Sequence, residues 1–156
     1  MEPNFNTWTI IFLIASAQGF FTALIFLKWR HGNPQANRIL SALIALFSLS
    51  MFEYVLYWTN YIYYWPHFAN LSVNFPFLYG ALFWLYLRTI YTGKALARGD
   101  VWHLLPFLFA SIPFLPWYFA DGDFKRTVVS GEQKFSYAGW AIRLQFSARI
   151  VYIVLM

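Results

Sequence analysis

The sequence contains no cysteine, which excludes a disulfide framework, a thiolate metal site and a cysteine nucleophile. Charged residues make up only 11% of the 156 residues, whereas a soluble domain carries about 25%. The His-Glu-x-x-His, Gly-x-Ser-x-Gly and P-loop patterns are also missing, so we expect no enzyme. His31, His67 and His103 lie far apart without metal-ligand spacing, and we predict neither a metal nor another cofactor.

Long uncharged runs account for this shortage of charge, and 60% of the residues are hydrophobic. No side chain from Thr9 to Leu27 is charged, and a helix of this length spans ~30 Å, the thickness of a bilayer's hydrocarbon core. Trp8 and Trp29 lie at its two ends, where indole rings prefer the headgroup layer. The N-terminus lacks the basic region of a signal peptide, so we expect this helix to be retained.

Further apolar segments come after it, and together they predict an all-α integral membrane bundle of about five transmembrane helices. Pro106, Pro113 and Pro116 interrupt the fourth segment, so we expect that helix to be bent or broken. The predicted helices cover residues 8–29, 39–58, 75–91, 101–120 and 136–156 of a single transmembrane domain, 1–156.

Basic residues are divided unevenly between the segments that join these helices. Cytoplasmic loops carry the excess of Lys and Arg, which predicts a multi-pass protein of the inner (cytoplasmic) membrane with its N-terminus outside. The net charge of +5 fits contact with anionic headgroups. The inner segments hold Lys28, Arg30, Arg38, Arg88, Lys94 and Arg98, and the outer segments before residue 136 hold Lys125, Arg126 and Lys134.

Glu53 is the only acid inside a predicted span, and an intramembrane charge is the best functional lead in such a sequence. By helical rise it lies ~7–8 Å below Trp58, and Arg143 lies ~10 Å into the last helix from its outer end. We predict that Glu53 and Arg143 pair across the bundle, because pairing relieves the cost of burying either charge alone. The pair could fix helix packing, or it could belong to an outward-opening ligand pocket with Tyr57 at its rim.

Two stripes of side chains predict contacts between helices. Small residues at steps of four in the first helix let a neighbour approach closely, although such residues are also common in membrane helices by chance. Polar residues at steps of four and three in the last helix face other helices or, for its arginine, the inner headgroups. The stripes are Ala15, Gly19 and Ala23 in the first helix, and Gln145, Arg149 and Tyr152 in the last.

Several stretches together resemble one protein family: WTIIFLIASAQGFF, NPQANRIL, FEYVLYWTNY and FPFLYGALFWLYLRTI, followed by WHLLPF. They are similar to the N-terminal membrane domain of transmembrane AraC-type transcriptional regulators of bacteria, and the resemblance covers most of residues 8–109. In that family a multi-helix membrane domain precedes a cytoplasmic helix-turn-helix domain that binds DNA. The resemblance implies a sensory or anchoring domain that perceives an unknown small-molecule or peptide ligand.

No helix-turn-helix segment is present in these 156 residues, so the family's DNA-binding residues map to no position here. The last apolar segment runs to Met156 without a cap or a basic flank, and we expect a chain truncated before the DNA-binding domain. Two other classes remain open: a fragment of a small-solute transporter, and a structural membrane subunit. The expected partners are the lipid bilayer, DNA through the missing domain, and further copies of the chain if it forms a homo-oligomer.

Overall fold

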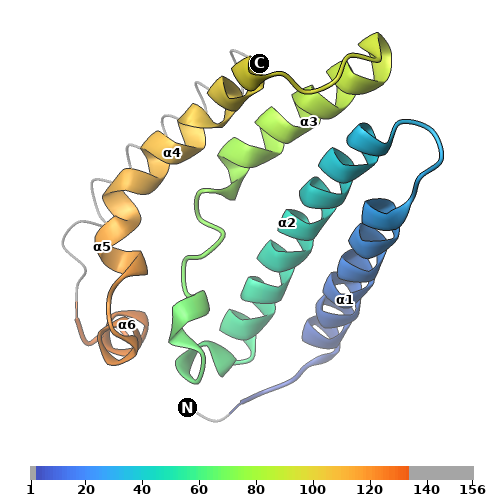
Figure 1. Ribbon diagram of the computed structural model, residues 1–156. Helices are drawn as coiled ribbons and strands as arrows, with labels where there is room; N and C mark the ends of the chain where they lie inside the picture. The colour runs from blue at the N-terminus through green and yellow to red at the C-terminus, as the bar shows by residue number, and fades with distance from the viewer. Residues whose placement is uncertain (1–2, 134–156) are drawn as a thin grey trace.

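The computed structural model describes residues 3–133, in which the regular structure is helical and no strand occurs. Three long helices lie side by side with alternating direction, and the second is in the middle (Figure 1). These helices are α1 (Thr7–Lys28), α2 (Pro34–Trp58) and α3 (Phe75–Thr92).

Shorter helical segments complete the described chain. A fourth rod, made of consecutive short pieces, lies beside α3, and α6 folds across the end of the bundle where α2 ends (Figure 1). The pieces of the rod are η3 (Arg98–Leu104), α4 (Leu105–Ser111), η4 (Ile112–Phe114) and α5 (Leu115–Tyr118), and the final helix is α6 (Gly122–Val129). Two single turns, η1 (Tyr61–Tyr63) and η2 (Pro66–Phe68), lie in the connection between α2 and α3.

The start of α1 is set by a reciprocal cap, and the observed helix agrees with the predicted 8–29 to within one residue. Asn6 Oδ1 accepts a hydrogen bond from the backbone N–H of Thr9 at 2.9 Å, and Thr9 Oγ1 accepts one from the backbone N–H of Asn6 at 3.0 Å. Each bond satisfies a backbone donor that helical geometry would leave without a partner.

The predicted start of the second helix, at residue 39, was wrong, because α2 already begins at Pro34. Asn33 Oδ1 accepts hydrogen bonds from the backbone N–H groups of Gln35 and Ala36, at 3.0 and 3.2 Å. Proline is well suited to the first helical position, where it needs no N–H partner. The Asn-Pro pair therefore starts the helix and does not form the turn that its sequence also suits.

The third helix and the broken fourth segment agree with the predictions, and the structure contains one helix that was not predicted. The helix α3 matches the predicted 75–91 closely, and the fourth segment is broken into short pieces, as its prolines predicted. The addition is α6, which was not expected; it begins after Asp121, whose carboxylate accepts from the backbone N–H of Asp123 at 3.2 Å. The fifth predicted helix, 136–156, lies outside the described residues.

Antiparallel packing of α1 on α2 depends on small side chains of α1 that repeat every seven residues. Thr9, Ser16 and Ala23 are the buried residues of α1. Ser16 Oγ donates to the carbonyl oxygen of Ser48 at 2.8 Å, and Ser41 Oγ donates to that of Ala23 at 2.7 Å. In a membrane such bonds between helices stabilise their association by about 0.6–2 kcal/mol each.

The predicted stripe of small residues lies partly in the contact between α1 and α2, here called the seam, and partly on the exposed surface. Gly19 lies against α2 so closely that an added Cβ would be 2.1 Å from Ser48 Oγ. Ala23 is buried in the same seam, whereas Ala15 is exposed and its neighbour Ser16 takes the contacting position. Two of the three predicted residues, Gly19 and Ala23, therefore lie in the contact with α2, and the fully buried positions of α1 repeat every seven residues.

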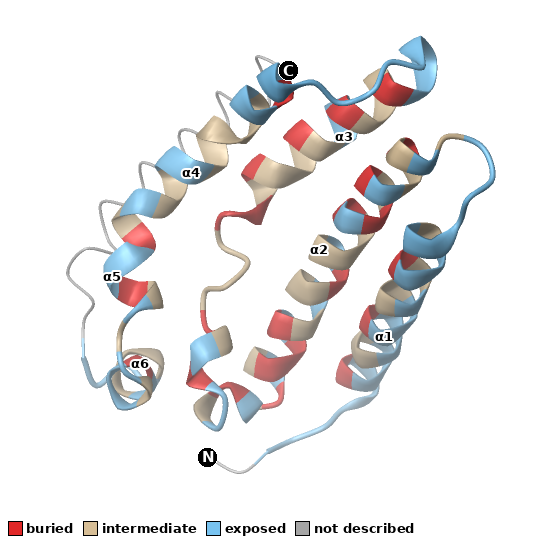
Figure 2. Cartoon of the chain, in the orientation of Figure 1, coloured by how far each residue is buried: buried red, intermediate tan, exposed pale blue. Residues whose placement is uncertain are grey.

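Three helical stretches within residues 3–133 are long and apolar enough to cross a membrane: Thr7–Lys28, Pro34–Trp58 and Arg98–Tyr118. The helix α3 is not among them, since Arg88 and several tyrosines lower its mean hydropathy. Figure 2 shows that α1 exposes most of its surface, whereas α2 is buried along the faces that meet its neighbours. The described part of the chain is therefore all-helical, with three helical stretches that are long and apolar enough to cross a membrane.

The two ends of the bundle differ in structure. At the loop end (residues 53–74 and 111–133), a buried core of Leu56, Ile62, Ala69 and Trp117 joins α2 to α5, and Trp117 Nε1 donates to the Ala69 carbonyl at 2.8 Å. At the basic end (residues 28–38 and 88–104) the helices are joined by exposed turns that carry most of the basic residues.

Candidate functional site

Glu53 is buried in α2, with 5% of its surface exposed, and it binds the chain that leads into α3. Its Oε2 accepts a hydrogen bond from the backbone N–H of Ser72 at 2.7 Å. The Ser72 hydroxyl and the backbone at Asn70 and Leu71 also lie near this carboxylate. Asn70 has the left-handed conformation (φ 59°), which lets successive backbone amides converge on one anion. Glu53 thus fastens the 70–72 turn to α2.

Tyr57 lies one helical turn from Glu53, as predicted from the spacing, and is half-buried. Its side chain lies near the backbone at Asn70, beside the same turn that Glu53 binds. Arg143 lies outside the described residues, and its pairing with Glu53 stays a prediction. The polar stripe of Gln145, Arg149 and Tyr152 also lies outside them.

A second group of polar side chains joins the start of α3 to the broken fourth rod. Asn74 is fully buried, and its Nδ2 donates to Ser111 Oγ and to the hydroxyl of Tyr118, each at 3.2 Å. Ser111 ends α4 and Tyr118 ends α5. Any movement of the fourth rod therefore acts on the N-terminus of α3.

Lys125 is the site residue that sequence reasoning missed. Although counted as a charge of the outer loop, it is only 2% exposed. Its Nζ lies 3.2 Å from Nδ1 of His67, donates to the Tyr118 carbonyl at 3.2 Å, and lies 5.9 Å from the centre of the Trp117 ring. Burial lowers the pKa of this ammonium, and the charge of Asp121 opposes that effect. In the described part of the chain, no carboxylate lies within ion-pair distance of Lys125.

An open cavity of about 430 Å³ lies between α3, the fourth rod and α6. Its polar lining comes from η2, α4, α5 and α6, and its apolar lining comes from the 70–72 turn, α3 and α4. The polar residues are His67, Ser111, Tyr118 and Lys125, and the apolar ones are Leu71, Phe75 and Phe107.

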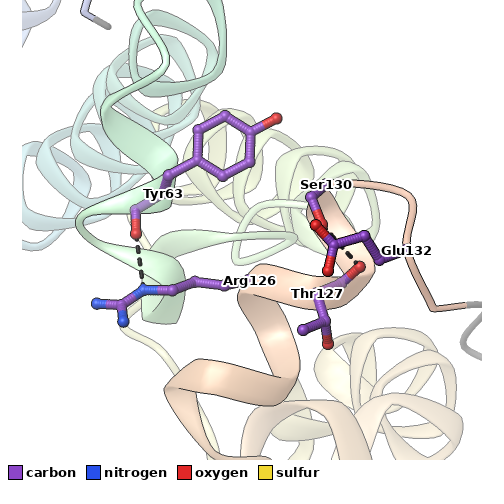
Figure 3. Close-up of a pocket in the computed structure, with 5 residues that line it drawn as sticks. All are labelled: Tyr63, Arg126, Thr127, Ser130 and Glu132. Atoms are coloured by element: carbon purple, nitrogen blue, oxygen red, sulfur yellow. Dashed lines mark hydrogen bonds between the residues drawn. The ribbon is translucent and has the colours of Figure 1, made fainter. Parts of the chain in front are cut away.

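A second cavity, of about 370 Å³, lies between α6 and η1, and most of its lining residues are exposed (Figure 3). Arg126 crosses it, with Nε donating to the Tyr63 carbonyl at 2.8 Å, and Nη1 pairs with Asp123 at 2.9 Å. Thr127, Ser130 and Glu132 form the opposite side. Both partners of this ion pair are largely exposed, so the pair contributes little to stability.

At the basic end the main polar contact is a two-pronged ion pair between Arg88 of α3 and Asp100 of η3. The Asp100 carboxylate also accepts from the backbone N–H of Ala97 at 2.7 Å. Asn33 Nδ2 donates to the Thr89 carbonyl at 3.3 Å and so ties the start of α2 to α3. These contacts fix the turns of the basic end, and none of them lines the cavities described above.

No family model matches the chain, and neither a curated protein nor a solved structure is significantly similar to it. The likeness to membrane-bound AraC-type regulators therefore remains a prediction from the quoted stretches. Within residues 3–133, no three His, Cys, Asp or Glu side chains gather as metal ligands would. The function has to be argued from the arrangement of the loop end.

Proposed function

We propose that the chain is the membrane-embedded, non-catalytic sensory and anchoring domain of a bacterial transcriptional regulator. In this proposal it crosses the inner membrane several times, with the N-terminus and the loop end outside. Its DNA-binding domain would lie in the cytoplasm, beyond residue 156.

The observation that carries this proposal is the polar construction of the loop end around the larger cavity. Lys125 and Ser111 line that cavity, and Glu53 fastens the 70–72 turn, which contributes its wall residue Leu71. A ligand in the cavity would touch elements that lead directly into α2, α3 and the fourth rod. Since these helices extend to the basic end, a displacement of the helices at the loop end would also change their positions at the basic end.

The scarcity of charge and the three membrane-length helices support the anchoring half of the proposal. A soluble sensor would need a polar surface, whereas α1 exposes Trp8, Ile14 and Phe21. Lipid satisfies these side chains without a protein partner.

The test is to read the source gene past codon 156. We expect further membrane segments and then a basic helix-turn-helix domain in the same reading frame. A stop codon, with no neighbouring frame that encodes a DNA-binding domain, would contradict the proposal and favour a structural subunit. A second, inverted set of membrane helices would favour a transporter.

The same full-length gene allows a functional test in its own host. Glu53→Gln should alter transcription of a reporter placed behind the target promoter, because it weakens the anchor of the 70–72 turn. Glu132→Gln removes an exposed acid from the same end and serves as the control. Equal reporter output in both variants and the wild type would contradict a sensory role for the loop end.

A further inference from the structure

We propose that the cavity at Lys125 binds a single-chain amphiphile with one anionic head, the head on Lys125 and the apolar chain along Phe107. This inference rests on the proposed sensory function and names the chemical class of its ligand.

Burial of the Lys125 ammonium costs free energy. An ammonium that leaves water without a carboxylate partner loses more solvation than two neutral acceptors and an aromatic ring return. Its contact partners are the His67 ring, the Tyr118 carbonyl and the Trp117 ring, and the charge of Asp121 acts on it only from beyond ion-pair distance. An uncharged side chain of similar length would fill this space at lower cost, so the charge points to an anion that binds there.

The lining of the cavity carries a single basic side chain among the described residues. Among the residues that the structure describes, Lys125 is the only Lys or Arg that lines this cavity, and no Asp or Glu lines it. One ammonium balances one negative charge. The hydroxyls of Ser111 and Tyr118 and the ring of His67 add neutral hydrogen-bonding groups, which suit the oxygens of a carboxylate or phosphate head.

The rest of the cavity lining is apolar. Leu71, Phe75 and Phe107 form an apolar wall that continues from the polar side into α4. The cavity volume of about 430 Å³ falls in the range of small-molecule sites, ~300–1,000 Å³. His67 is exposed and Lys125 is buried, so the polar side opens at His67 and closes at Lys125.

The experiment measures binding of tritiated decanoate to the whole chain in nanodiscs of neutral phosphatidylcholine. We expect saturable binding. Decanol should compete at least about tenfold more weakly than unlabelled decanoate, because it lacks the charge, and a hydrogen bond to a charged group contributes about 1.5–3 kcal/mol. Lys125→Met should weaken binding to a similar degree, and Lys125→Arg should restore most of it. Lys28→Met, which removes an exposed basic residue at the basic end, is the matched control and should bind as the wild type does.

A second variant keeps the test decisive if Lys125→Met fails to give a monodisperse protein. Leu71→Trp narrows the cavity from its apolar side and leaves Lys125 in place, so it too should weaken decanoate binding. Equal competition by decanol and decanoate, or unchanged binding in Lys125→Met or Leu71→Trp, would overturn the proposal.

The source of the anion is settled by adding phosphatidylglycerol to the nanodiscs. Displacement of decanoate by this lipid assigns the cavity to an anionic bilayer lipid, and its persistence assigns it to a free amphiphile. Binding in nanodiscs does not depend on any domain beyond residue 156. Failure here would therefore remove the ligand class alone, whereas the gene reading tests the regulator.

Discussion

The two ends of the bundle treat buried charge in opposite ways. At the basic end Arg88 and Asp100 face each other and form a two-pronged ion pair. At the loop end Glu53 and Lys125 are buried more deeply, yet neither meets an opposite charge among the described residues. Glu53 is held by the 70–72 turn, and Lys125 by His67 and the Tyr118 carbonyl.

This difference separates a structural contact from a responsive one. A directly paired charge has its partner already and gains little from a third group. A buried charge held only by neutral groups still attracts an opposite charge, from a ligand or from another segment. The buried charges at the loop end can therefore still attract a charged group, whereas Arg88 and Asp100 at the basic end already neutralise each other. This difference agrees with a sensor at the loop end and a fixed turn at the basic end.

The largest expected loss of stability comes from replacing Glu53, whose carboxylate anchors the 70–72 turn. This variant tests whether the buried charge at the loop end stabilises the fold through backbone groups alone. Glu53→Leu leaves the Ser72 N–H without its acceptor, and we expect a loss of about 2–3 kcal/mol in the free energy of unfolding. Thermal unfolding in detergent, followed by circular dichroism, measures this loss. The control Glu132→Gln should unfold like the wild type, and equal stability of the two variants would show that the turn does not depend on Glu53.

The second prediction concerns the ion pair at the basic end, tested by a double-mutant cycle with Arg88→Met and Asp100→Asn. We expect each single variant to lower the unfolding temperature, and the double variant to lose less than the sum, because each single change leaves the other partner unmatched. Additive losses would mean that the two side chains do not act as a pair. The contrast between the ends would then disappear.

The smallest effect concerns Lys125 and the dependence of stability on pH. Because burial lowers its pKa, the unfolded chain binds a proton on this side chain at pH values where the native state does not. Native stability should therefore rise with pH between that lowered pKa and the ordinary value of 10.5, and stay level below the window.

Lys125→Met should abolish that rise. Unfolding temperatures measured from neutral pH to 10.5 give the comparison. His67, Tyr118 and Asp121 surround Lys125 in both proteins, so the difference between the two curves isolates the lysine. Parallel curves would mean that Lys125 is as well solvated in the native state as in the unfolded chain.

The long helices could be predicted from the sequence because uninterrupted apolar runs and caps are local signals. Short motifs were harder to interpret where the same residues suit two different local structures. Asn33-Pro34 suits a turn and also a helix start, and the cap at Asn33 decides for the helix. Asp121-Gly122-Asp123 follows the end of the fourth rod, as expected, and Asp121 also caps the next helix, which was not predicted.

The site was harder to predict for a different reason. Burial of Glu53 follows from its position in an apolar run, but its partners are backbone amides, which carry no signature in a sequence. Lys125 lies in a polar stretch that suggested solvent. A signal existed in the spacing of Lys125, Val128 and Val129, which places them on one face of α6, and Val128 and Val129 pack on the core of the loop end.

The most direct test of the central claim uses the absence of cysteine, since any introduced thiol is unique. Ser130→Cys places a thiol at the exposed loop end, and His31→Cys places one in the exposed turn of the basic end. In intact spheroplasts, a membrane-impermeant maleimide should label Ser130→Cys at once and His31→Cys only after permeabilisation. Equal labelling of both thiols from outside would contradict a bundle whose two ends lie on opposite sides of a membrane.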